Sequence, residues 1–118
     1  MKKISVVMTM LFMSIAVIVH AQGDSTTTFK VYGNCESCKA RIEKAAKAAG
    51  ATRADWSEET KMIEVSFNSA KTSSDKIQQK IAAVGHDTEK YKSLENAYNK
   101  LPGCCKYERE AGEKDKQQ

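Results

Sequence analysis

Imidazole and thioether side chains are scarce after residue 21 of this sequence, which limits the kinds of metal site that this part of the chain can build. There are two histidines, His20 and His86, and four of the five methionines precede residue 14. Cysteine is better represented, with four residues in the 118-residue chain. A metal site in this protein would therefore rest mainly on thiols, which prefer soft ions.

A strong excess of charge of either sign is also lacking. The 19 basic and 15 acidic residues give a formal net charge of +4. This excess is too small to indicate nucleic-acid binding or a polybasic contact with a membrane. Long apolar runs are also rare. The one present lies near the N-terminus, over residues 4–19.

That apolar run has the features of a secretory signal peptide. Lys2 and Lys3 precede it, and Val19 and Ala21 occupy the small-residue positions of a cleavage site. We expect cleavage after Ala21, which predicts an exported protein, periplasmic or secreted, with no membrane attachment. A retained membrane anchor is the alternative. The expected organisation is a signal peptide over 1–21, a domain over 22–92 and a C-terminal extension over 93–118.

The remaining pattern predicts an α+β domain. After a loose polar leader over 22–27, we expect strands over 29–31, 51–57, 61–67 and 86–92, and helices over 36–49 and 74–84. The order βαββαβ is that of the ferredoxin-like fold, in which two helices cover one face of an antiparallel sheet. In this topology, His86 lies at the same edge of the molecule as the loop that follows the first strand.

Two cysteines, Cys35 and Cys38, lie in that loop as a C-x-x-C motif at the start of the first helix. A helix N-terminus favours the thiolate, and the charge of Lys39 would add to this effect. Three uses are open: binding a soft metal, a structural disulfide, or thiol–disulfide exchange. A thioredoxin-like oxidoreductase is disfavoured because that fold needs a cis-proline loop, and the one proline, Pro102, lies in the C-terminal extension.

The stretches GNCESCKARIEKAAKAAG, KMIEVSFNS and KIQQKIAAVGH together resemble the heavy-metal-associated domain, from about Thr27 to Lys92. That family includes small copper chaperones, the N-terminal modules of copper-transporting P-type ATPases, and a periplasmic mercury-binding protein. The resemblance implies that Cys35 and Cys38 bind the metal. The sequence shows no cysteine–histidine–aspartate set and no phosphate-binding loop, so we also expect that the protein is not an enzyme. Two thiolates with few competing hard ligands select soft ions, so Cu(I) is the first candidate, with Hg(II), Zn(II) or Cd(II) as alternatives. The expected partner is a metal-transporting ATPase or another metal acceptor. Gly33 stands where the family usually has methionine, so we expect a less firmly anchored loop.

Three further residues are candidate ligands. His86 is a candidate third ligand, because the topology brings it to the edge of the molecule where Cys35 and Cys38 lie, called here the metal edge. Cys104 and Cys105 either form a candidate second soft-metal site or fold over the first one, with a disulfide to Cys35 or Cys38, or free thiols, as the alternatives. We expect a helix over 93–101, capped by Ser93 and stopped by Pro102 and Gly103. A fourth strand that runs away from the metal edge would carry this extension to the opposite end, so we expect the second site to be separate from the first.

Overall fold

The structure is a computed structural model that describes residues 24–109, so the expected signal peptide over 1–21 and the last nine residues lie outside it. Within the described range, no helix has the length and apolar content needed to cross a membrane. The elements in chain order are β1 (Asp24–Lys30), α1 (Glu36–Ala48), β2 (Ala51–Trp56), β3 (Met62–Asn68), α2 (Ser74–Ala83), α3 (Glu95–Asn99) and a 3₁₀ helix, η1 (Gly103–Cys105).

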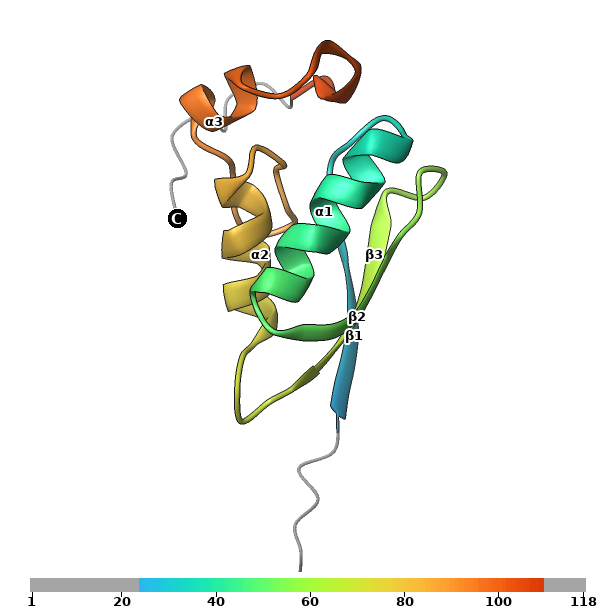
Figure 1. Cartoon of the computed structure of the whole chain (residues 1–118), viewed down its shortest axis with the longest axis vertical. Coiled ribbons are helices and arrows are strands. Elements are labelled where there is room, and N and C mark those ends of the chain that lie inside the picture. The colour runs from blue at the N-terminus through green and yellow to red at the C-terminus, as the bar shows by residue number, and fades with distance from the viewer. Residues whose placement is uncertain (1–23, 110–118) are drawn as a thin grey trace, which may run out of the picture.

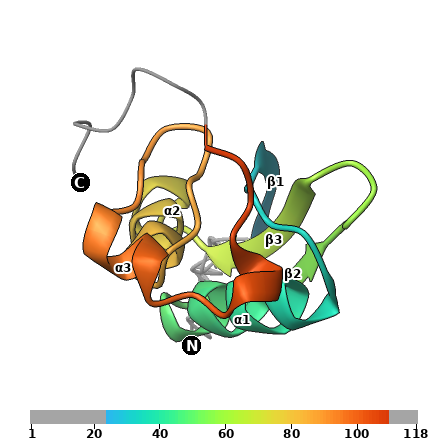
Figure 2. The ribbon, with the colours of Figure 1, turned by 90° about the horizontal axis from the view of Figure 1, so that it is seen from above.

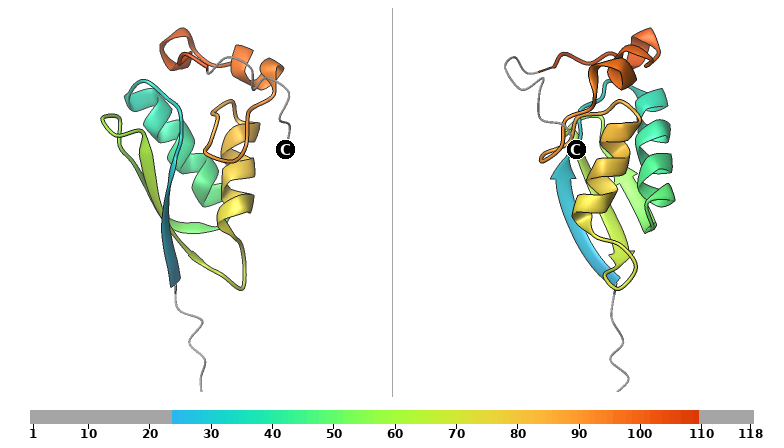
Figure 3. Two further views of the ribbon diagram at one scale, coloured as in Figure 1. Left: turned by 180° about the vertical axis from the view of Figure 1, so that it is seen from behind. Right: turned by 90° about the vertical axis from the view of Figure 1, so that its left-hand side faces the viewer.

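The expected α+β, ferredoxin-like arrangement is confirmed. The three strands form an antiparallel sheet in the order β1-β3-β2. Helices α1 and α2 lie side by side on one face of that sheet (Figures 1 and 3). The alternation predicted for β3 is also present, because Ile63, Val65 and Phe67 are buried while their neighbours are not. These side chains and the apolar faces of the two helices form the core.

The expected fourth strand, over 86–92, is reduced to a single bridge between Val31 and Thr88 beside β1. A tight turn ends the pairing there, since the Thr88 N–H donates to the Tyr91 carbonyl at 2.7 Å. The side-chain oxygen of Gln78, on α2, holds this turn by accepting from the Thr88 hydroxyl and the Lys90 N–H, each at 3.0 Å. The chain therefore turns back towards the end of the molecule from which the strand began.

The N-terminal leader expected over 22–27 is wrong for its described part, because β1 begins at Asp24. This half of the strand carries no apolar alternation, and hydrophobic periodicity therefore missed it. Its threonines are β-branched and suit an extended backbone. Thr26 pairs with Ser66 of β3, and their hydroxyl oxygens lie 3.0 Å apart.

The helix boundaries follow the capping signals closely for α1 and α2 but not for α3. Ser73 caps α2 by accepting from the Lys76 N–H at 3.2 Å, and Gly50 follows α1 with a φ of 109°. The helix predicted over 93–101 is shorter, covering only Glu95–Asn99, and Ser93 is not its cap. The Ser93 N–H instead donates to the buried carboxylate of Asp87 at 2.7 Å, which keeps Ser93 outside the helix.

The C-terminal segment, defined here as residues 94–109, crosses the end of the molecule where α1 begins and α2 finishes (Figures 1 and 2). The prediction that it lies at the opposite end is wrong. The turn at Thr88–Tyr91 explains the difference, because it reverses the chain before the expected strand can carry it away. Helix η1 consequently lies over the start of α1, beside the C-x-x-C motif.

Among the described glycines, Gly85 leaves the least room for a side chain. Its φ is 112°, and a Cβ there would lie 2.8 Å from Leu101 Cδ2 and 2.9 Å from the Ala97 carbonyl oxygen. We expect Gly85→Ala to lower the free energy of unfolding by about 1–3 kcal/mol, through backbone strain alone, before the clash is counted. Urea unfolding measures this change.

Gly103→Ala is the matched control for this substitution. A Cβ at Gly103 would meet no atom within 4 Å, so the free energy of unfolding of Gly103→Ala should stay close to that of the wild type. Equal stability of the two variants would contradict the close packing of the C-terminal segment against Gly85.

Candidate metal centre

The loop between β1 and α1 presents the two C-x-x-C thiols differently. Cys35 is the N-cap of α1, with an extended backbone, and is half-buried. Cys38 lies in the first turn of the helix and is fully buried in the core. Their sulfur atoms are 3.6 Å apart, and the Asn34 N–H points at the Cys38 sulfur from 3.4 Å. The motif thus places one accessible thiol next to one that belongs to the core.

Trp56, at the end of β2, supports this loop from below. A Cβ at Gly33 would lie 3.2 Å from Trp56 Cη2 and 3.1 Å from Cys38 Cβ. The indole N–H donates to the Val31 carbonyl at 2.9 Å, which fixes the ring in place. No motif in the sequence indicates this role for Trp56. Gly33 leaves a space that the tryptophan fills. Trp56 therefore anchors the loop at the position where Gly33 was expected to weaken it.

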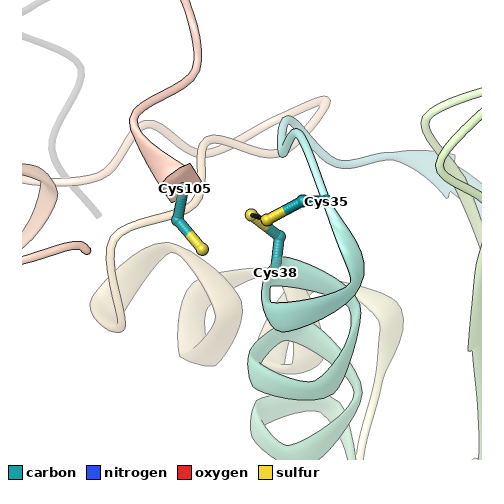
Figure 4. Close-up of side chains that lie close together, drawn as sticks. All are labelled: Cys35, Cys38 and Cys105. Atoms are coloured by element: carbon teal, nitrogen blue, oxygen red, sulfur yellow. Dashed lines mark hydrogen bonds between the residues drawn. The ribbon is translucent and has the colours of Figure 1, made fainter. Parts of the chain in front are cut away.

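Cys105 joins the pair from η1. The sulfur atoms of Cys35, Cys38 and Cys105 all lie within 4.8 Å of one another, and Cys105 is fully buried (Figure 4). Among the described residues, this is the one group of three or more cysteine, histidine or acidic side chains close enough to share an ion. The expectation that the C-terminal thiols lie far from the first site is therefore wrong. Cys104 is exposed, with its sulfur 4.0 Å from that of Cys105.

Ser37, inside the C-x-x-C motif, contacts three of the thiols. Its hydroxyl oxygen lies 3.1 Å from the Cys35 sulfur, 3.2 Å from that of Cys104 and 3.3 Å from that of Cys105. Hydrogen bonding from this hydroxyl, and then from the backbone at Cys38, lowers the pKa of Cys35 to about 6. Burial, followed by the hydrogen bond with Cys38, raises the pKa of Cys105 to about 12. The accessible thiol is thus the more acidic one.

Lys39 is not what stabilises the Cys35 thiolate. Its ammonium group donates to the Asp55 carboxylate at 2.7 Å, to the Trp56 carbonyl at 2.9 Å, and to Glu43. Asp55, and then Glu43, raise the pKa of Lys39 to about 12. The lysine therefore ties α1 to the end of β2. The expectation that its charge stabilises the Cys35 thiolate is wrong, because hydrogen bonds around Cys35 have that effect.

His86 lies near the loop but is not part of the thiol group. It is fully buried, its Nδ1 is 2.7 Å from the Tyr32 carbonyl oxygen, and its ring stacks on Tyr107 with centroids 5.7 Å apart. Its Nε2 has no hydrogen-bond partner among the described residues. Burial lowers the pKa of His86, so the neutral imidazole is the form that fits this environment. The geometry gives His86 a structural position beneath the C-terminal segment.

No family model and no curated protein matches this chain. Solved structures do match. Oxidized MerP from Ralstonia metallidurans CH34 is 30% identical, over 57% of this chain and 96% of that one, with a TM-score of 0.53. The CopZ metallochaperone is 27% identical, over 54% and 98%, with a TM-score of 0.52. The water-soluble region of the P-type ATPase CopA from Bacillus subtilis is 32% identical, over 56% and 45%, with a TM-score of 0.52.

The role of Ser37 is testable by its effect on Cys35. We expect Ser37→Ala to raise the pKa of Cys35 from about 6 towards the ordinary thiol range, because the hydroxyl donor is lost. The pH dependence of iodoacetamide labelling at Cys35, followed by peptide mass spectrometry, measures this shift. Ser66→Ala, on β3, is the control and should leave the labelling profile unchanged. An unaltered profile in Ser37→Ala would rule out this source of acidity.

The lowered pKa of His86 predicts a pH dependence of stability. Below about pH 6.5, His86 binds a proton in the unfolded chain but not in the folded one. The free energy of unfolding therefore falls as the pH falls, by at most about 1.4 kcal/mol per pH unit. We expect His86→Gln to flatten the stability curve of the metal-free protein between pH 7 and pH 5, measured by urea unfolding. Parallel curves for the two proteins would contradict a buried neutral imidazole.

Proposed function

Because the chain belongs to the heavy-metal-associated domain family, we propose that it is an exported carrier of Cu(I) that releases its ion to an acceptor protein by thiolate exchange. The observation that carries this proposal is the pair of thiols at the start of α1, with sulfur atoms 3.6 Å apart and one of them accessible. In this proposal, Cys35 and Cys38 hold the ion. The basic N-terminal residues and the apolar run over 4–19 support export.

The ligand chemistry supports a soft ion. Thiolates select Cu(I), Hg(II), Zn(II) and Cd(II), whereas carboxylates suit harder cations. Among residues 24–109, no carboxylate and no imidazole joins the thiol group. The similarity to the CopZ metallochaperone and to part of the P-type ATPase CopA supports Cu(I) as the cargo and a metal-transporting ATPase as the acceptor. Hg(II), Zn(II) and Cd(II) remain the alternative cargoes, for which the protein would serve in detoxification.

Ligand exchange would begin at Cys35. Cys38 is buried beneath the loop, so an incoming thiolate would approach the ion from the side on which Cys35 is partly exposed. The acidity of Cys35 suits this role, because a thiolate with a lowered pKa binds a metal at neutral pH and is also a good leaving group. A carrier of this kind needs no catalytic residues beyond the thiols.

Thiol–disulfide exchange is the competing function, and the same lowered pKa of Cys35 favours it. The two functions differ in a simple pair of assays. A carrier competes with a colorimetric chelator for Cu(I) and does not accelerate the reduction of insulin, whereas an oxidoreductase accelerates insulin reduction. Acceleration by the wild type that disappears in Cys35→Ser would favour the oxidoreductase.

We expect Cys35→Ser and Cys38→Ser each to weaken Cu(I) binding by roughly tenfold or more, since even outer-shell partners of a metal cost this much. The double variant should lose binding altogether, because both thiolates of the C-x-x-C motif are gone. Competition with a Cu(I) chelator measures these affinities, and circular dichroism of each metal-free variant checks the fold. Wild-type affinity in the folded double variant would overturn the proposed function.

A further inference from the structure

We propose that Cys105 is a third thiolate ligand of this metal site, carried across the C-x-x-C loop by the C-terminal segment. The proposal rests on the function proposed above, and it adds a residue outside the motif that defines the family. Cys105 lies 67 residues after Cys38 in the sequence, yet the two sulfur atoms and that of Cys35 lie within 4.8 Å of one another (Figure 4).

The spacing of the sulfur atoms suits three ligands around one ion. With a metal–sulfur bond of about 2.3 Å, as for zinc thiolates, sulfur atoms are about 4.0 Å apart in a planar three-coordinate site and about 4.6 Å apart in a linear two-coordinate one. The Cys35–Cys38 separation of 3.6 Å is closer to the first value. An ion at the centre of the three sulfur atoms would need small movements only.

Helix η1 is in direct contact with the loop that it covers. The Cys35 thiol donates to the Cys104 carbonyl at 3.5 Å, and the Ser37 hydroxyl lies 3.3 Å from the Cys105 sulfur. The Cys105 side chain points down towards the pair, whereas Cys104 is exposed. The two adjacent cysteines are therefore not equivalent, and Cys105 is the one placed to bind.

Tyr107, two residues after Cys105, holds the segment in this position. It is buried, its hydroxyl donates to the Gly85 carbonyl at 2.8 Å, and it accepts from the Asp87 N–H at 2.7 Å. Its ring stacks on His86 and meets the ring of Tyr98 edge-on, with centroids 5.1 Å apart. Both hydrogen bonds join the segment to backbone groups of the turn after α2, which is part of the rigid domain.

A buried ion pair adds a second attachment. Arg109 donates from Nε and from Nη2 to the two carboxylate oxygens of Asp87, at 2.9 and 2.8 Å, and from Nη2 to the Ser93 carbonyl at 2.7 Å. Only 13% of the Arg109 side chain and 2% of the Asp87 side chain are exposed. Paired, forked hydrogen bonds of this kind orient both groups strongly. Cys105 is thus presented by a fixed segment, with little further entropy to lose when it binds an ion.

A third thiolate changes how the ion leaves. In a site closed by Cys105, an acceptor thiolate has to displace a ligand that lies on the C-terminal segment before the ion is free. The ion would therefore be held more tightly, and released more slowly, than by the C-x-x-C motif alone. Cys104→Ser and Cys105→Ser form a matched pair with which to separate these effects.

X-ray absorption spectroscopy of the full chain, loaded with one equivalent of Cu(I) without added thiols, counts the sulfur ligands directly. We expect three sulfurs in the wild type and in Cys104→Ser, and two sulfurs at a shorter mean distance in Cys105→Ser. Chelator competition should show Cys105→Ser to bind Cu(I) roughly tenfold more weakly. Two sulfurs in the wild type would overturn the proposal.

The double variant Cys104→Ser/Cys105→Ser covers the case in which Cys104 replaces its neighbour. Three sulfurs in Cys105→Ser and two in the double variant would still assign a ligand to this segment, whereas three sulfurs in the double variant would exclude one. The outcomes also separate the two proposals. Two sulfurs throughout, with one equivalent of Cu(I) bound, leaves the carrier function intact, while absence of Cu(I) binding in every protein refutes the carrier itself.

Discussion

The carboxylate of Asp87 is buried where three parts of the chain meet: the loop between β1 and α1 (the metal loop), the turn after α2, and the C-terminal segment. The backbone carbonyl of Asp87 accepts from the Tyr32 N–H at 2.9 Å. The Asp87 side chain accepts from the Ser93 N–H and from Arg109. A buried charge of this kind is tolerated only when it is paired and hydrogen-bonded. The need to neutralise one carboxylate therefore brings the end of the chain back over the thiols.

Much of the domain could be predicted because its signals are local. The alternation in β3, the cap at Ser73 and the glycine after α1 each act within a few residues of sequence. The C-x-x-C motif was equally predictable, since its position at the start of a helix brings the two thiols close together. The threonine-rich half of β1 was not, because its partners lie on β3, and β-branching without apolar alternation is a weak signal.

The position of Cys105 could not be predicted for a different reason. It depends on contacts between residues about 20 positions apart, chiefly Asp87 with Arg109 and Gly85 with Tyr107. A charged residue near a chain end usually indicates a solvated tail, and a tyrosine among charges gives no direction. The turn at Thr88 was decisive as well, because an intact fourth strand would have carried the chain to the opposite end of the molecule.

The tryptophan beneath the metal loop gives this protein an optical probe of its own. Trp56 is the only tryptophan in the chain, and its ring edge approaches Gly33, the residue that also meets Cys38. Trp56 is 1% exposed and belongs to the same hydrophobic core cluster as Cys38. A heavy ion or a shift of the loop would change the surroundings of this one fluorophore. Its emission can therefore follow loading and release in unlabelled protein, including the time course of transfer to an acceptor that lacks tryptophan.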